Sequence, residues 1–549
     1  MFDVKKVKFY GEEAPKTSDS KEIVYDTTSG NGSLKLSSTG NPFVDDFGTI
    51  AKYRQPREIQ EVFRTMEELW SINPILCLKE SVYLRIITRD TKLFDGIKVK
   101  SIGQGLKAEF FSRLMWLAVY QPETFKKNLP LFIAAGSWDD LFELMRLDLS
   151  YEHDGNKYKR ALDWKFVGAF IMEGLKDPEQ CELIKKFLPT IKAAKYCTTK
   201  RSQCSNYIGK WLAKLLFGSE DKVKANIQYQ KLKSSGTAHE WQQLISQKKF
   251  DKLDFSKIPG RALNILANSN FLSNHGLEES FAKWVLEQPK AKFTGFVYEL
   301  FKPARKEYQK ELINRQFMTL VDKAKEQQDR TKFICCLDTS GSMESACYGL
   351  PNTTSLNVAK SIALYFSYLL DSQFSGYLEF SGTVDLQTWE GDTPYDKFFH
   401  RDYGSWGTTN FLGVADWFVK TKKGLNLPEE LFPNGVICIS DGEFNSYSGQ
   451  FDSNFKEFKR RLAEAFSQEF VDNFKLVLWD IPNTFYSNKP ESKFESLADE
   501  SNFFYISGFD PAGITFLTGK TPADRPAPKT AEELFEAAMN QELLNLLKV

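Results

Sequence analysis

The pattern of hydrophobic positions changes near residue 325 of the chain. From about residue 43 to residue 325, apolar residues recur at steps of three and four, which is the spacing of amphipathic helices. From residue 326 to about 520, short apolar runs alternate with helical stretches, a pattern typical of a sheet with helices on both faces. The sequence therefore predicts an N-terminal α-helical domain over 43–325 and a doubly wound α/β domain over 326–520.

The predicted helical domain consists of short amphipathic stretches separated by Pro and Gly. One apolar stripe comprises Ile59, Val62, Phe63, Met66, Leu69 and Trp70. Similar stripes follow over 110–118 and 131–145. Helices of this length and number suggest stacked helical hairpins, as in a repeat of the HEAT type, although no exact sequence period is present. An irregular helical bundle is the alternative.

The predicted α/β domain has six strand candidates and three long helix candidates. The strands are expected over 333–337, 376–380, 384–389, 436–440, 475–480 and 502–507, and the helices over 356–370, 411–422 and 455–470. The second and third strands flank a Ser-Gly turn, which predicts an adjacent pair. The remaining alternation favours a mostly parallel sheet with right-handed crossovers.

The two ends of the chain have patterns of their own. Residues 1–42 pass into a stretch rich in Gly, Ser and Asn, which predicts an extended N-terminal arm. Within residues 521–549, an apolar stripe with helical spacing runs over 531–547 after two prolines. We expect this C-terminal helix to dock on one of the two domains.

Composition describes a large globular protein without a global charge. The 549 residues exceed the size of a single core, and 42% hydrophobic with 26% charged residues excludes a disordered chain. Lys and Arg total 72, as do Asp and Glu, so the net charge is zero. No global field attracts nucleic acid, and any basic surface must be local.

The cysteines and histidines argue for a reducing compartment and against zinc. Three of the eight cysteines, Cys335, Cys336 and Cys438, lie in predicted strands, where a free thiol acts as a small core residue. None of the four histidines is spaced as a metal ligand. The N-terminus lacks the apolar core of a signal peptide, and no run approaches 18 apolar residues. We expect a soluble cytoplasmic protein.

Polar oxygen groups follow two of the predicted strands. The strand over 333–337 leads into Asp338, with hydroxyls following at Ser340 and Ser342, and the strand over 436–440 leads into Asp441. A small polar loop with Thr409 lies between them in sequence. Ligands of open α/β sheets bind where such strand ends meet, and oxygen donors suit Mg²⁺ or Mn²⁺. The alternative is that these side chains only cap helices and turns.

This arrangement resembles the metal-ion-dependent adhesion site of von Willebrand factor A domains. The resemblance rests on Asp-x-Ser-x-Ser, a Gly-Thr-Thr-Asn loop and a strand-end Asp-Gly in this order. It implies that Ser340, Ser342 and Thr409 supply hydroxyls, and that Asp338 and Asp441 bind the metal directly or through water. It also implies an open coordination position for an oxygen of a partner.

A basic stretch lies between residues 185 and 233. It contains twelve basic residues and two acidic ones, with Tyr196, Tyr207 and several amides between them. Cations neutralise phosphates while aromatic rings and amides bind splayed bases, a combination that suits single-stranded RNA. An ordinary solvated helix surface is the alternative. The candidate RNA-binding residues are Lys192, Lys195, Lys200, Arg201, Lys210 and Lys214.

A helical region followed by a von Willebrand A-like domain resembles the architecture of TROVE-module proteins, the Ro autoantigen and its bacterial relatives. The segments over 37–47, 136–141 and 258–263 are also similar to segments of that family. The resemblance implies a ring of helical repeats that binds small structured RNAs outside and single-stranded RNA ends inside. The metal-site domain would close the ring.

These observations favour a non-enzymatic RNA-binding protein whose metal-site domain engages a partner. The alternative is a protein-interaction or assembly factor that binds an acidic side chain of a partner at the metal and does not bind RNA. An enzyme is a third possibility. The sequence shows no nucleophile, general base and oxyanion donor in register, and no Gly-rich phosphate cradle, so we expect no catalytic activity.

Overall fold

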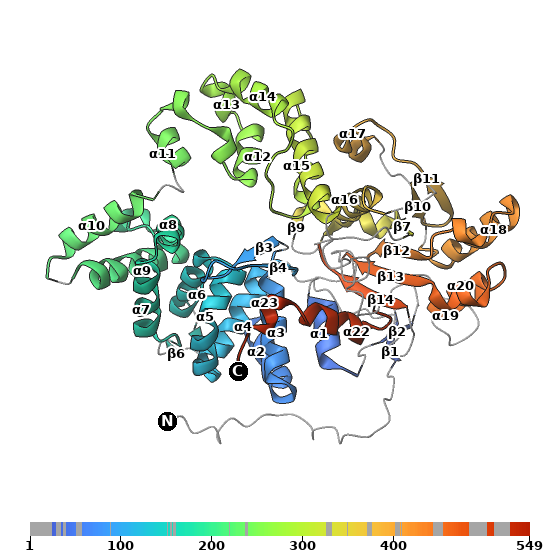
Figure 1. Ribbon diagram of the computed structural model, residues 1–549, viewed down its shortest axis with the longest axis horizontal. Helices are drawn as coiled ribbons and strands as arrows, with labels where there is room; N and C mark the ends of the chain where they lie inside the picture. The colour runs from blue at the N-terminus through green and yellow to red at the C-terminus, as the bar shows by residue number, and fades with distance from the viewer. Residues whose placement is uncertain are drawn as a thin grey trace.

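The computed structural model joins a helix-rich N-terminal half to a mixed six-stranded sheet (Figure 1). It describes residues 40–50, 57–87, 89–150, 161–218, 220–236, 240–325, 332–347, 350–370, 376–400, 407, 409–442, 454–481, 502–509 and 528–549, and strand residues 25–28, 34–36, 152–153 and 156–157. Most of the predicted N-terminal arm lies outside these ranges. Within it, β1 (Tyr25–Thr28) pairs antiparallel with β2 (Leu34–Leu36).

Most helices of the helical half pack on the next helix in sequence. The helices are α1 (Pro42–Ile50), α2 (Ile59–Ile72), α3 (Pro74–Arg85), α4 (Lys107–Tyr120), α5 (Pro122–Ala135), α6 (Trp138–Ser150), α7 (Trp164–Gly174), α8 (Pro178–Phe187), α9 (Lys200–Phe217), α10 (Lys222–Ser234), α11 (Glu240–Ser246), α12 (Gly260–Asn268), α13 (Phe271–Asn274), α14 (Glu278–Glu287) and α15 (Glu307–Lys325). Proline stands in the first turn of α3, α5 and α8, where its missing N–H group is not needed. The predicted helical character of this half is confirmed.

Two short antiparallel pairs interrupt the helices. β3 (Arg89–Lys92) pairs with β4 (Lys98–Ser101), and β5 (Glu152–His153) pairs with β6 (Asn156–Lys157). The apolar periodicity did not indicate the first hairpin, because Val99 is the one apolar residue of β3 and β4, and the other buried positions, Thr91 and Ser101, are polar.

The sheet follows the order β11-β10-β7-β12-β13-β14, and only the β10–β11 pair is antiparallel. Its strands are β7 (Phe333–Asp338), β10 (Tyr377–Phe380), β11 (Val384–Gln387), β12 (Gly435–Ser440), β13 (Lys475–Asp480) and β14 (Phe503–Ser507). A separate small pair, β8 (Ala346–Cys347) and β9 (Leu350–Thr354), follows β7. The six predicted strands are therefore confirmed, and the sheet is mostly parallel as expected.

Helices cover both faces of the sheet. Alternate residues of β7 enter two different cores: Cys335 and Leu337 pack on the side of α16 (Ser355–Ser367), and Ile334 and Cys336 on the side of α18 (Leu412–Leu425). The remaining helices of this half are α17 (Pro394–Phe399), α19 (Asn454–Leu462) and α20 (Gln468–Asn473). The cysteines predicted in strands are buried free thiols.

Two predicted helices are each broken into two, so the single helices expected over 455–470 and 531–547 were wrong. The first becomes α19 and α20, because the Ser467 hydroxyl accepts a hydrogen bond from Phe470 N (3.2 Å) and starts a new helix. The second becomes α22 (Ala531–Met539) and α23 (Glu542–Asn545). Between them, the Gln541 amide bonds both backbone groups of Ile102, at 2.7 and 3.0 Å.

The chain crosses between its two halves more than once. Helices α11–α15 arch from the helical half to the sheet, and α22 and α23 run back from the sheet to the helices (Figure 1). Helix α15 packs against α12, α14 and α17. Its Asn314 accepts a hydrogen bond from Tyr395 N (2.8 Å), and its Phe317 lies in the core beneath the sheet.

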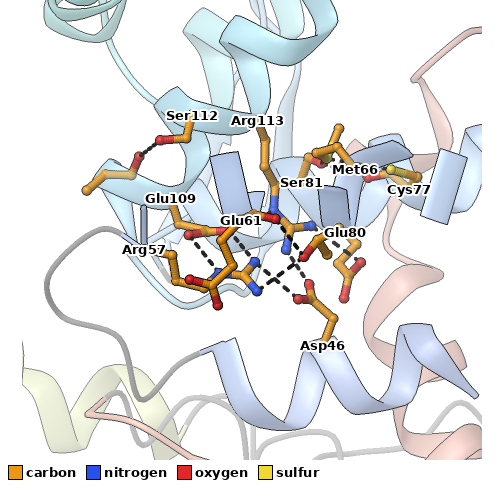
Figure 2. A network of polar contacts seen from close by, with 12 residues as sticks. Asp46, Arg57, Glu61, Met66, Cys77, Glu80, Ser81, Glu109, Ser112 and Arg113 are labelled. Carbon is orange, nitrogen blue, oxygen red and sulfur yellow. Dashed lines mark hydrogen bonds and ion pairs between the residues drawn. The ribbon is translucent and has the colours of Figure 1, made fainter. Parts of the chain in front are cut away.

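Helix α1 lies where the helical half, the sheet and the C-terminal helices meet. Its Asp46 is bound by the guanidinium groups of Arg113 in α4 and of Arg57, which are also bound by Glu109 (Figure 2). Glu80 of α3 lies 3.5 Å from Arg113 and is fully buried. These five side chains, which we call the junction network, are all almost completely withdrawn from solvent.

The charges of the junction network balance only if one carboxyl is neutral. Burial, aided by the negative charge of Asp46, raises the pKa of Glu80 well above its usual 4.5. One carboxyl oxygen of Glu80 has no hydrogen-bond partner among the described residues, as suits a protonated group. Burial by itself would raise the pKa of Asp46, but the charges of Arg113 and Arg57 outweigh it and lower that pKa. Two cations then face two carboxylates.

We predict that Asp46→Asn destabilises the protein by about 3 kcal/mol, because removing one partner of a buried ion pair leaves the other charge uncompensated. Since the pKa of Asp46 is lowered on folding, this stabilisation is present above the unfolded pKa and is lost as the pH falls through the folded value. Urea denaturation measures the change. The control is Asp45→Asn, on the neighbouring, less buried position. Equal losses in the two variants would contradict the role of the network.

We predict the opposite sign for Glu80→Gln. The raised pKa of Glu80 means that its contribution is complete below the unfolded pKa and is lost as the pH rises toward the folded value. Glutamine cannot ionise, so the variant should gain stability relative to the wild type as the pH is raised from about 5 to about 8. Thermal unfolding at the two pH values measures the difference. A loss of stability that is larger at the higher pH would show that Glu80 is needed as a carboxylate.

Candidate metal site and basic helix face

The ends of β7 and β12 bring the two predicted carboxylates to one edge of the sheet. Asp338 ends β7 and is fully buried. Its Oδ1 accepts a hydrogen bond from Ser340 N (2.9 Å), and its Oδ2 accepts one from Ser440 Oγ (2.5 Å) at the end of the neighbouring β12. Asp441 follows directly and is 1% exposed. The strand pairing therefore places two parts of the predicted motif side by side.

The two serine hydroxyls of the motif also converge. Ser340 Oγ and Ser342 Oγ lie 3.2 Å apart, and both side chains are buried. They come close together because the chain turns into a short 3₁₀ helix (Gly341–Glu344) directly after Ser340. Adjacent ligands of an octahedral Mg²⁺ with bonds of about 2.1 Å lie roughly 3 Å apart. The two hydroxyls therefore have the spacing that one cation requires.

Thr409 lies in a loop that is attached to the same edge through β10. Asn410 N donates to Ser381 O (2.8 Å), directly after β10, and Thr409 is 2% exposed. Gly407 approaches Ser381 and Gly382 so closely that a Cβ atom would lie 2.7 Å from Gly382 N. Only glycine fits there without displacement. The structure thus places Thr409 near the strand ends, while Thr408 and residues 443–450 lie outside the described ranges.

The electrostatics of the two carboxylates favour a bound cation. Burial, and then the negative charge of Asp441, raise the pKa of Asp338 to about 7, although hydrogen bonds from Ser440 and Ser340 oppose the shift. A divalent cation between the carboxylates would remove the repulsion. In the described ranges, no group of three or more His, Cys, Asp or Glu side chains could hold a metal. Two carboxylates with hydroxyls fit a hard cation such as Mg²⁺ or Mn²⁺ and do not fit zinc.

Three of the predicted RNA-binding lysines share one face of α9. Lys200, Lys210 and Lys214 are exposed at positions that return to the same side of the helix, together with Tyr207, which is 46% exposed. We call these four residues the α9 face. The opposite side of α9 buries apolar residues that include Ile208 and Leu212. Thr199 caps the helix with a reciprocal capping box, which fixes where α9 begins.

The remaining candidates lie in other positions. Arg201 points away from the α9 face and forms an ion pair with Glu143 of α6, with Nη1 and Oε2 2.7 Å apart. Lys192 and Lys195 are exposed in the segment before α9, and Lys195 Nζ lies 5.0 Å from the ring centroid of Tyr196. Within the described part of the chain, these two lysines and those of the α9 face form no ion pair with an acidic side chain.

The pairing of Arg201 was not visible in the sequence. Glu143 lies 58 residues earlier, on a helix that contacts α9 only in the folded protein. No local charge pattern indicates a contact over that separation, since i,i+4 pairing rules apply only within one helix.

Comparisons with known proteins include a likeness to a solved structure. No protein-family model matches the sequence, and no curated protein matches it either. Among solved structures, the chain is similar to the Ro (RSR) protein of Deinococcus radiodurans, with 13% identity over 91% of this chain and 99% of that chain and a TM-score of 0.41. A likeness at this level does not define a ligand or an activity. Across the described residues, every helix is too short or too polar to cross a bilayer.

We predict that Mg²⁺ raises the melting temperature of the wild type but not that of Ser340→Ala/Ser342→Ala. A ligand that binds only the folded state stabilises it by about 2.7 kcal/mol at a concentration of about 100 times Kd. Calorimetry measures the shift, and electron paramagnetic resonance of Mn²⁺ counts bound ions directly. Ser345→Ala, in the same loop, is the control. Equal metal binding by wild type and double variant would contradict the site.

Proposed function

We propose that this chain is a non-enzymatic RNA-binding protein. Its helical half, a helical-repeat domain of the TROVE type, binds small structured or single-stranded RNA. Its α/β half is a von Willebrand A-type domain that holds Mg²⁺ or Mn²⁺ and engages a partner. The observation that carries the RNA proposal is the α9 face, where exposed lysines without acidic partners in the described residues surround an exposed tyrosine.

The α9 face has the chemistry that a single RNA strand requires. Lys200 and Lys214 are separated by fourteen positions, or about 21 Å along the helix axis, which is long enough for several consecutive phosphates. Their charges are not engaged by carboxylates of the described residues, so binding phosphate breaks no ion pair there. Exposed tyrosine rings at Tyr196 and Tyr207 offer surfaces on which bases stack, which contributes about 1–3 kcal/mol per base.

Arg201 does not belong to this surface. Its guanidinium is bound by Glu143, so an RNA phosphate would have to compete with that carboxylate. We therefore assign RNA contacts to Lys192, Lys195, Lys200, Lys210 and Lys214, and a structural role to Arg201.

The metal site supports the second part of the proposal. Its donor set is buried, contains only oxygen atoms and includes two carboxylates that repel each other. In this arrangement Ser340, Ser342 and Thr409 would hold the ion through their hydroxyls, with Asp338 and Asp441 binding directly or through water. The ion would supply a positive charge that attracts an oxygen of the partner. The same site would also serve the alternative function, that of an assembly factor that binds an acidic residue of a partner and does not bind RNA. We place the protein in the cytoplasm.

We predict that Lys200→Glu/Lys210→Glu/Lys214→Glu weakens RNA binding and flattens its salt dependence. Each lost phosphate contact should reduce the slope of log K against log salt by about 0.7, so the triple variant should lose about 2. Fluorescence anisotropy with a single-stranded RNA and a structured RNA carrying a 3′ tail, over a salt series, measures both quantities.

The matched control carries the same charge change elsewhere. Lys98, Lys100 and Lys420 are exposed and have no acidic partner in the described ranges, so Lys98→Glu/Lys100→Glu/Lys420→Glu alters net charge equally. Equal weakening by both triple variants would show that only the overall charge matters. No binding by the wild type above the non-specific level would leave the assembly factor as the better function.

A further inference from the structure

A pocket of about 360 Å³ lies in the helical half, between the turn of the β3–β4 hairpin and the junction of α7 with α8. The hairpin contributes Phe94, α7 contributes Phe170 and Glu173, and Asp177 lies at the start of α8. None of these residues belongs to the α9 face or to the metal site, so this pocket is a separate feature.

One wall of the pocket is aromatic and held in place from behind. The rings of Phe94 and Phe170 have centroids 6.0 Å apart and are inclined at 51°. Trp138, which is 1% exposed, supports this wall. Its ring is stacked on that of Phe170, with the two ring centroids 5.2 Å apart. Its indole N–H donates to Gln180 Oε1 (2.9 Å), which fixes the ring to α8. Phe94 itself is 38% exposed, so part of its ring is accessible to a ligand.

The rim of the pocket is acidic. Asp177 accepts a hydrogen bond from Gln180 N (2.8 Å) as the N-cap of α8, and within the described residues it has no ion-pair partner. Glu173 is paired with Lys176 (2.6 Å), but both side chains are 73% exposed, so this pair is weak and easily exchanged. Helix α7 ends at Gly174 in the pocket lining, and the C-terminal end of a helix favours a positive charge.

Two features of the pocket oppose the binding of a cation. Lys176 also lines the pocket, and the start of α8 carries the positive end of its dipole. The lining nevertheless holds two carboxylates, Glu173 and Asp177, against the one ammonium of Lys176, so its formal charge is negative. This negative charge, the two aromatic rings and the end of α7 together favour a positively charged ligand over phosphate.

We infer that this pocket binds an arginine side chain of a partner protein. A guanidinium group is planar, so it can stack on Phe94 and Phe170 while its N–H groups donate to the second carboxylate oxygen of Asp177. The ammonium group of a lysine is not planar, so it would stack less well on the two rings. An RNA strand is excluded by the same carboxylates, because they would repel its phosphates.

The test uses the full chain and a fluorescein-labelled neutral peptide with one central arginine, compared with the same peptide carrying citrulline. Citrulline keeps the shape of arginine and removes its charge. We expect the arginine peptide to bind about tenfold more tightly, the scale of one partly desolvated cation–π contact with an ion pair. Asp177→Asn preserves the helix cap, so it tests the charge without unfolding α8.

Three variants decide the outcome. We expect Asp177→Asn and Phe94→Ala each to weaken binding of the arginine peptide about tenfold. Glu179→Gln should leave binding unchanged, because Glu179 is a carboxylate of the same helix turn that pairs with Lys92 (2.5 Å) and does not line the pocket. Equal binding of the two peptides, no binding up to millimolar concentration, or equal effects of all three variants would overturn the inference.

Discussion

The buried pairing of Asp46 with Arg113 is the contact on which the arrangement of the two halves depends. Arg113 is fully buried in α4 and Asp46 belongs to α1, so the pair attaches α1 to the helical half. The same short helix is bound to the sheet, because Ser507 Oγ at the end of β14 donates to Gly48 O (2.5 Å). Removing α1 would leave a guanidinium charge buried without its closest carboxylate, which makes separation of the halves unfavourable.

The apolar contacts of α1 add to this ionic attachment. The ring centroid of Phe47 lies 5.4 Å from that of Tyr83 in α3 and 5.3 Å from that of Phe535 in α22. This one side chain therefore joins the helical half to the C-terminal segment. Because α1 lies at the end of β14, it shares an edge of the sheet with the candidate metal site. Backbone bonds continue along that edge, from Ile481 N to Ser440 O and from Gly508 N to Asp480 O. The site and the junction therefore rest on the same row of strand ends.

The sheet, and the placement of the candidate metal residues at its edge, could be predicted from the sequence because both depend on local patterns. A buried parallel strand appears as a continuous apolar run, and the residue that ends it is found directly at the sheet edge. The junction network could not be found in this way, since Asp46 and Arg113 are 67 positions apart and only the Glu109–Arg113 pair is local, at i,i+4. The same holds for Arg201 and Glu143. The breaks at Ser467 and Gln541 depend on side-chain bonds that compete with helix continuation, which apolar periodicity does not register.

The net charge of zero conceals local surfaces of opposite sign on the helical half. The α9 face presents lysines, while the pocket at Phe94 has carboxylates at its rim. At physiological ionic strength the Debye length is about 8 Å, so charges separated by more than this distance act almost independently. A ligand at either surface would therefore experience mainly the charges close to it, and the neutrality of the whole chain does not cancel them. Balanced composition is therefore compatible with one domain that binds polyanions at one place and cationic side chains at another.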